Sequence, residues 1–182
     1  MNKLLILLCV TATITGLSSA YAQNDPMVGG AAMYPSKNIV QNALNSKDHT
    51  TLVAAVKAAG LVDTLEGPGP FTVFAPTNQA FDNLPSGTVA NLLKPQNLDQ
   101  LKKILTYHVV PGTITTKDLH RLIKQGGGKA TLTTVESGPL TATMSGHHYN
   151  ITDAKGNTAT ITIPNVYQSN GVIQVINRVL LP

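Results

Sequence analysis

The stretch Gly171-Val-Ile-Gln-Val-Ile-Asn-Arg-Val-Leu-Leu-Pro182 decides the fold, because it has a counterpart far away in the chain. That counterpart, GPFTVFAPTNQAF, occupies residues 69–81. Each segment contains a short, continuous apolar run that leads into a turn, which is typical of a strand buried on both faces. We therefore expect residues 71–75 and 172–176 to form two central strands.

The rest of the chain shows helical periodicity first and strand alternation later. Apolar residues at helical spacing predict helices over residues 37–44, 50–59, 78–84, 97–106 and 116–124, and one further helical turn over residues 61–65. Ser36 is expected to cap the first helix, and Asp48 or Thr50 the second. Alternation of period two predicts strands over residues 130–135, 140–145, 148–152 and 159–163. This segregation favours an α+β fold with at least six mostly antiparallel strands and about five helices.

The first 22 residues are predicted to be a signal peptide that is separate from this fold. Lys3 is followed by an apolar stretch from Leu4 to Leu17, and Ala20-Tyr-Ala22 is a typical cleavage site. Cys9, the only cysteine, lies inside this segment, so no disulfide is expected after cleavage. The residue before Cys9 is not the small one that lipoprotein processing requires, so no lipid anchor is expected.

The remaining chain is expected to be one exported domain. A lead-in of residues 23–37 precedes a domain of residues 38–182, and no later segment is apolar enough to cross a membrane. We therefore expect a secreted or periplasmic protein without membrane insertion. The formal charge of +4 becomes +3 without Lys3, and this small surplus argues against a nucleic-acid partner. We expect a monomer.

No sequence pattern indicates catalysis or a cofactor. The chain has neither a G-x-S-x-G nor an H-E-x-x-H motif, and its carboxylates are scattered singly. His147 and His148 are neighbours on a predicted strand and point to opposite faces, which disfavours a shared metal ion. Met27 and Met33 have the side chains of a soft-metal site, but they can equally cover an apolar edge. We therefore assign no catalytic residue, metal ligand or cofactor.

Three segments together resemble the fasciclin (FAS1) family of extracellular adhesion domains, and the segments DPMVGG at residues 25–30 and MYPSKN at residues 33–38 resemble the lead-in of its secreted single-domain bacterial members. GPFTVFAPTNQAF is similar to the first signature of the family, TYHVVPG at residues 106–112 to its Tyr-His motif, and SNGVIQVINRVLLP at residues 169–182 to its second signature. The resemblance implies a wedge-shaped β-sandwich with helices packed at one side and no catalysis. It also assigns a structural or adhesive role to Phe71, Thr72, Phe74, Pro76, Thr77, Asn78, Tyr107, His108, Asn170, Gly171, Gln174 and Asn177.

The chain departs from the family pattern at three of these positions. Gln174 stands where members often carry His, whereas Asn177 and Asn78 stand where Asp is common. The changes remove charge and keep hydrogen-bonding side chains, so the fold is expected to persist without integrin-type recognition. Gln174 should be hydrogen-bonded inside the fold, and Tyr107 and His108 should be buried with their polar atoms paired.

Two functional hypotheses follow. A third, that the chain is an enzyme, has no motif to support it. The first is adhesion at a cell surface or in an extracellular matrix, through a protein or polysaccharide partner. The alternative is a periplasmic or extracellular protein that binds a small ligand, apolar or a metal.

Mass spectrometry of the exported protein is expected to show an N-terminus at Gln23, free or cyclised to pyroglutamate, with no lipid. The reason is the cleavage site that ends at Ala22. An acylated Cys9 at the N-terminus would contradict both the cleavage site and the unanchored state.

Overall fold

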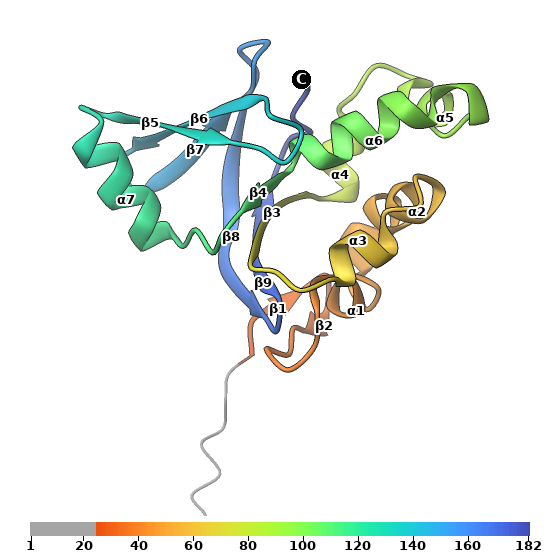
Figure 1. Ribbon diagram of the computed structural model, residues 1–182, viewed down its shortest axis with the longest axis horizontal. Coiled ribbons are helices and arrows are strands. Elements are labelled where there is room, and N and C mark those ends of the chain that lie inside the picture. Colours follow the sequence, from red (N-terminus) through yellow and green to blue (C-terminus); the bar gives the residue numbers. More distant parts are fainter. Residues whose placement is uncertain (1–24) are drawn as a thin grey trace, which may run out of the picture.

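The computed structural model describes residues 25–182 (Figure 1). The predicted signal peptide, including Cys9, lies outside the described residues. Seven strands form one sheet in the order β4-β3-β9-β8-β7-β6-β5. Their bounds are β3 Phe71–Pro76, β4 Val109–Pro111, β5 Lys129–Thr133, β6 Pro139–Ser145, β7 His148–Thr152, β8 Thr158–Gln168 and β9 Gly171–Ile176. Only β3 and β9 pair in parallel, so the expectation of a mostly antiparallel sheet is confirmed.

The sheet is continuous and folds along β8. Residues 158–160 of this strand pair with β7, and residues 161–168 pair with β9 through two shifts of register. Irregularities of this kind bend a strand and increase its twist. Beyond β5, the Val135 amide donates to the Val109 carbonyl of β4 at 2.8 Å, which joins the two ends of the sheet. The resemblance implied a sandwich of two sheets. The structure instead has one sheet whose two halves share β8.

Seven α-helices lie in the described residues, two more than the approximate number expected. They are α1 Ile39–Ala43, α2 Thr50–Ala58, α3 Val62–Glu66, α4 Asn78–Asp82, α5 Thr88–Leu92, α6 Leu98–Tyr107 and α7 Thr116–Gln125, with 3₁₀ turns at Lys47–His49 and Pro95–Asn97. The short helix α5 was not predicted from the sequence. It begins after Gly87, whose φ of 81° reverses the chain at a conformation that suits glycine.

The resemblance implied that the helices pack at one side of the sheet, but the structure places them at two sides. In Figure 1, α1 to α6 lie beside β3 and β4, whereas α7 lies under the half of the sheet that contains β5 and β6. A capping box fixes the start of α7, because Thr115 and Asp118 each bond the other's backbone amide. Each half of the folded sheet therefore has its own helical cover.

Two apolar clusters form the core, one on each face of the central strands. Val73 and Ala75 of β3 belong to the first cluster, which α1 to α6 cover, whereas Phe74 belongs to the second. The same alternation places Ile173 in the first cluster and Ile176 in the second. All six residues of β9 are buried, so the prediction of two central strands with both faces covered is confirmed.

The N-terminal lead-in completes the first cluster. Two short strands, β1 Met27–Val28 and β2 Ala31–Ala32, form a ribbon that was not predicted. Met33 is buried in the core, whereas the side chain of Met27 is exposed. Met33 therefore covers the apolar edge, and the two methionines have different environments.

Two helix starts differ from the expectation. Helix α1 begins after Asn38 instead of Ser36, because Asn38 and Gln41 form a complete capping box.

Neither Asp48 nor Thr50 caps α2, and its N-cap residue His49 makes no side-chain capping bond. Asn78, at the start of α4, caps α2 instead. Its Oδ1 accepts from the Thr51 amide at 3.0 Å, and its Nδ2 donates to the Lys47 carbonyl at 2.8 Å.

Asn78→Ala is expected to destabilise the protein by about 1–2 kcal/mol, because it removes a helix cap and a link between two helices. Urea unfolding monitored by circular dichroism measures this change. Asn83→Ala is the matched control, since Asn83 is exposed at the end of α4 and caps no helix with its side chain. Equal unfolding midpoints for the two variants would contradict the cross-capping role.

Candidate functional site

The twelve residues singled out by the three motifs lie in and around the parallel pair of β3 and β9. Phe71, Thr72, Phe74 and Pro76 lie on β3, and Gly171 and Gln174 lie on β9. The register pairs Phe71 with Gly171 and Phe74 with Gln174. Gly171 is required there, because a Cβ at this position would collide with the carbonyl oxygen of Phe71. The first and second signatures are thus in direct contact.

Thr72 of β3 and Gln174 of β9 both bond the backbone of Ile114. The Thr72 hydroxyl donates to the Gly112 carbonyl at 2.6 Å and accepts from the Ile114 amide at 2.8 Å. Gln174 Nε2 donates to the Ile114 carbonyl at 3.0 Å, and its Oε1 accepts from the Asn165 amide at 3.0 Å. Both side chains are fully buried. The expected internal bonding of Gln174 is confirmed, and its function there is to anchor the connection between β4 and α7.

Tyr107 joins the end of α6 to the other half of the sheet. Its ring is fully buried, and its hydroxyl donates to the Pro139 carbonyl at 2.6 Å and accepts from the Ala154 amide at 2.9 Å. Burial raises the pKa of Tyr107, so the phenol stays protonated. Gly138 lies against the ring, where a Cβ would clash.

His108 is buried as a neutral imidazole. Its Nδ1 donates to the Ile104 carbonyl at 2.8 Å, and its Nε2 accepts from the Leu180 amide at 3.0 Å. This pair of bonds requires a proton on Nδ1 and none on Nε2. Burial lowers the pKa of His108 from 6.5 to about 4, which agrees with the neutral form. The expectation that Tyr107 and His108 are buried with paired polar atoms is confirmed.

The remaining polar motif residues tie helices and loops to the sheet ends. Thr77 caps α4 by accepting from the Ala80 amide. Asn170 accepts from the Ile39 amide at the start of α1 at 3.0 Å and donates to the Leu65 carbonyl of α3 at 2.8 Å. Asn177 is exposed, and its Oδ1 accepts from the Thr160 amide of β8 at 2.8 Å.

Asp153 and His49 are two of the buried polar residues that the sequence analysis missed. The carboxylate of Asp153 accepts from the backbone amides of Lys155, Asn157 and Leu181. His49 is buried beside Ser46, whose hydroxyl lies 2.9 Å from Nδ1, and burial lowers the pKa of His49. The Asp-x-x-Gly pattern at residues 153–156 was the one sequence signal for Asp153, whereas no pattern of neighbouring residues indicates that His49 is buried.

The described residues contain no group of three or more His, Cys, Asp or Glu side chains that could hold a metal ion. His147 and His148 lie exposed at the turn between β6 and β7. None of the helices within residues 25–182 is both long and apolar enough to cross a bilayer. The polar motif residues form a hydrogen-bonded framework around β3 and β9.

The folded sheet with helices over each half defines a FAS1-type domain, and comparisons with known proteins agree. A solved structure of a FAS1 domain pair from the insect cell adhesion molecule Fasciclin I matches with a TM-score of 0.71 and 21% identity, over 81% of this chain and 52% of that chain. Residues 47–182 match the fasciclin domain family.

Relatives at higher identity give the same assignment. Protein sll1483 of Synechocystis sp. is 45% identical over 161 residues, which are 88% of this chain and 82% of that protein. Cell surface glycolipoprotein MPB83 of Mycobacterium bovis is 31% identical over 172 residues, which are 92% of this chain and 70% of that protein. The chain belongs to the fasciclin domain family.

The stability of the protein is expected to fall as the pH drops from 6.5 to about 4. In this window the unfolded chain binds a proton at His108 that the folded chain does not bind. The contribution is fully present above pH 6.5, and its loss at low pH is roughly 3 kcal/mol. The lowered pKa of His49 acts in the same direction. Thermal unfolding measured across this range checks the slope.

His108→Gln is expected to reduce this slope, because the amide does not titrate. His148→Gln, at an exposed histidine, is the matched control. An identical pH profile for the wild type and His108→Gln would show that His108 is not the titrating group.

Proposed function

We propose that this chain is an exported, non-catalytic adhesion domain that binds a protein or polysaccharide at a cell surface or in an extracellular matrix. One observation carries the proposal: each polar side chain among the twelve motif residues makes an intramolecular hydrogen bond. Polar side chains that bond other groups of the protein are suited to holding the fold together, which favours an architectural role for the motifs over chemistry on a substrate. The name of the relative MPB83, a cell surface glycolipoprotein, supports the location.

In this proposal the three motifs have an architectural role, and the partner contacts other residues. The Tyr-His motif shows the distinction, since Tyr107 and His108 are 0% and 3% exposed. Adhesion lost on mutation of either residue would then follow from loss of folded protein.

A shallow depression next to the second signature is the proposed contact surface. It has a volume of about 460 Å³ and is bordered by Pro68, Pro70, Thr113, Tyr167 and Asn170. Tyr167 is 49% exposed at the end of β8, so its ring and hydroxyl are both available to a partner. Tyrosine suits such a surface because it combines apolar area with a hydrogen-bonding group.

In this proposal the chain is divided as the sequence predicts. Residues 1–22 are the signal peptide, residues 23–37 the lead-in and residues 38–182 the adhesion domain. Export would then deliver the adhesion domain to the envelope or the medium.

Attachment of beads coated with the exported protein to cells of the producing strain tests the proposal. Tyr167→Ser is expected to lower attachment several-fold without a change in melting temperature, because the side chain is on the surface. Met144→Ser, an exposed substitution on β6, is the matched control and should retain attachment. His108→Gln should lose attachment only in proportion to its unfolded fraction. Full attachment by Tyr167→Ser would refute the proposed surface, and absence of attachment by the wild type would refute adhesion.

A second candidate function, the binding of a small ligand, is supported by an apolar cavity under α1, α2 and α3. The cavity lies on the helical side of β3, and its occupant would be apolar instead of a metal ion.

A further inference from the structure

The positive charge of the protein is concentrated in one segment. The chain has 13 Lys and Arg residues against 9 Asp and Glu residues, and without Lys3 the surplus is three. Residues 116–129, which span α7 and the first residue of β5, contain four basic residues and one acidic residue. This segment therefore carries the whole surplus, and basic and acidic residues balance in the rest of residues 25–182.

Three of these cations form a row along α7, which we call the basic row. Lys117, Arg121 and Lys124 are spaced by four and three residues, so they lie next to one another on one side of the helix. All three are exposed, and the row extends over about 10 Å. Leu119 and Ile123 of the same helix are buried in the second cluster. Since α7 lies at the outer border of its half of the sheet in Figure 1, the basic row faces solvent.

The cations of the basic row are available to a partner. Within residues 25–182, Lys117 and Lys124 make no salt bridge. Arg121 donates from Nη2 to Oδ1 of Asp118 at 3.0 Å, and its guanidinium group has further N–H donors. The Asp118 carboxylate also accepts from the hydroxyl and the amide of Thr115, so it is occupied at the start of the helix. An anion can therefore bind the row without breaking a contact of the fold.

The geometry of the basic row suits a polymer with repeated anionic groups. Side chains that follow one another along a helix lie side by side and do not converge on one point. A single small anion would need several cations around it, whereas a linear polyanion can meet them one after another. Binding of this kind gains affinity from several weak contacts on one molecule.

The surroundings of the basic row favour a polysaccharide among the polyanions. None of the large hydrophobic residues that are exposed in residues 25–182 lies on α7. A protein partner would use apolar or aromatic anchors, and a bilayer would take up an exposed apolar side of the helix. Residues 116–129 also contain no Phe, Tyr or Trp on which nucleic-acid bases could stack. A hydrophilic, charged polymer needs none of these features.

We propose that the basic row binds an acidic polysaccharide, with carboxylates of uronic acid units paired with Lys117, Arg121 and Lys124. The proposal rests on the adhesion function above and names the class of partner. Thr113 borders the depression beside Tyr167 and precedes α7 by three residues, so a polymer bound to α7 has that depression nearby.

Binding of the exported protein to immobilised polygalacturonate, measured by biolayer interferometry, tests the proposal. Polygalacturonate should bind, and neutral dextran should not. The affinity should fall several-fold between about 50 and about 150 mM NaCl, because salt screens exposed ion pairs. Absence of binding to polygalacturonate would refute the proposal. Tighter binding of double-stranded DNA, or of vesicles that contain anionic lipids, would overturn the assignment to a polysaccharide.

A triple variant with Lys117→Gln, Arg121→Gln and Lys124→Gln should weaken binding to polygalacturonate about tenfold, because three exposed ion pairs each contribute modestly. Glutamine has a helix propensity close to that of lysine and arginine, so α7 should persist. The double variant Lys117→Arg with Lys124→Arg keeps the charge and should retain the affinity. Loss of affinity in this double variant would contradict a role that depends on charge.

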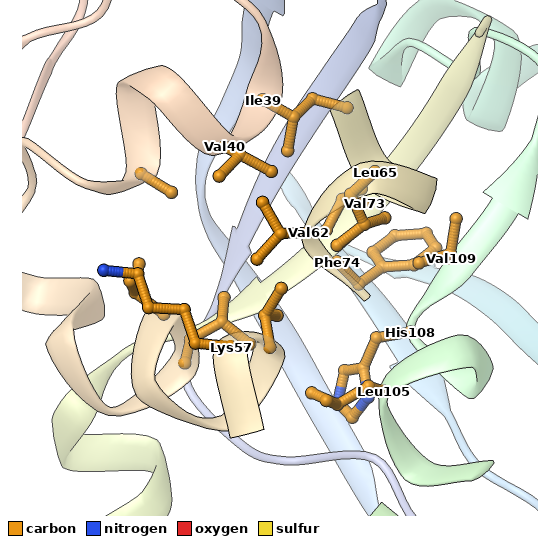
Figure 2. A pocket seen from close by; sticks show the side chains of 14 residues that line it. Ile39, Val40, Lys57, Val62, Leu65, Val73, Phe74, Leu105, His108 and Val109 are labelled. Carbon is orange, nitrogen blue, oxygen red and sulfur yellow. The ribbon is translucent and has the colours of Figure 1, made fainter. Parts of the chain in front are cut away.

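The matched control removes three exposed lysines outside α7, through Lys57→Gln, Lys94→Gln and Lys155→Gln. Lys57 is the one charged residue in the lining of the apolar cavity (Figure 2), Lys94 follows α5, and Lys155 lies in the turn between β7 and β8. This control changes the net charge by the same amount and should bind nearly as tightly as the wild type. Equal losses in the two triple variants would refute the basic row as the site.

Two further measurements separate this proposal from misfolding and from the adhesion function. The double variant Lys117→Gln with Lys124→Gln leaves the bond between Arg121 and Asp118 in place, should keep the wild-type melting temperature, and should still weaken binding about fivefold. In the bead assay, attachment by a wild type that does not bind polygalacturonate would refute only the polysaccharide. Binding of polygalacturonate without attachment to cells would refute only adhesion.

Discussion

The parallel pairing of β3 with β9 is the constraint on which the rest of the structure depends. The two strands are far apart in sequence, are covered on both faces, and are the only parallel pair of the sheet. Because both faces are covered, the rest of the chain must supply α1 to α6 on one side and the remaining strands with α7 on the other. The close approach at Phe71 and Gly171 leaves no space for a side chain at residue 171.

Polar side chains hold the connections that leave this pair. Thr72 accepts from the amide of Ile114 and Gln174 donates to its carbonyl, and Tyr107 connects α6 with two turns of the other half of the sheet. These contacts link neighbouring layers of the fold. Gln174 makes its bonds with an amide, which does not ionise. Residue 174 therefore neither binds nor releases a proton between the two halves of the sheet.

The sequence predicted the elements whose signal is local and missed those that depend on distant partners. The central strands, α6 and α7 follow from apolar runs and helical periodicity. The division of β8 between two partners could not be predicted, because strand alternation does not specify which strand lies alongside. Asn78 capping α2 from α4 was also missed, since a side chain that bonds across the fold leaves no mark near the helix it caps. The same limit applies to His108, whose burial was expected but whose partner Leu180 was not.

The position of β9 along the chain has a consequence for biosynthesis. This strand lies at the centre of the sheet but follows all the other strands in the sequence. A nascent chain that lacks it can form local helices and the hairpins of β5 to β7, but it has no partner for the inner edge of β3. The two apolar clusters remain open until residues 171–176 emerge, so most of the core closes in one late step with contacts of long sequence separation.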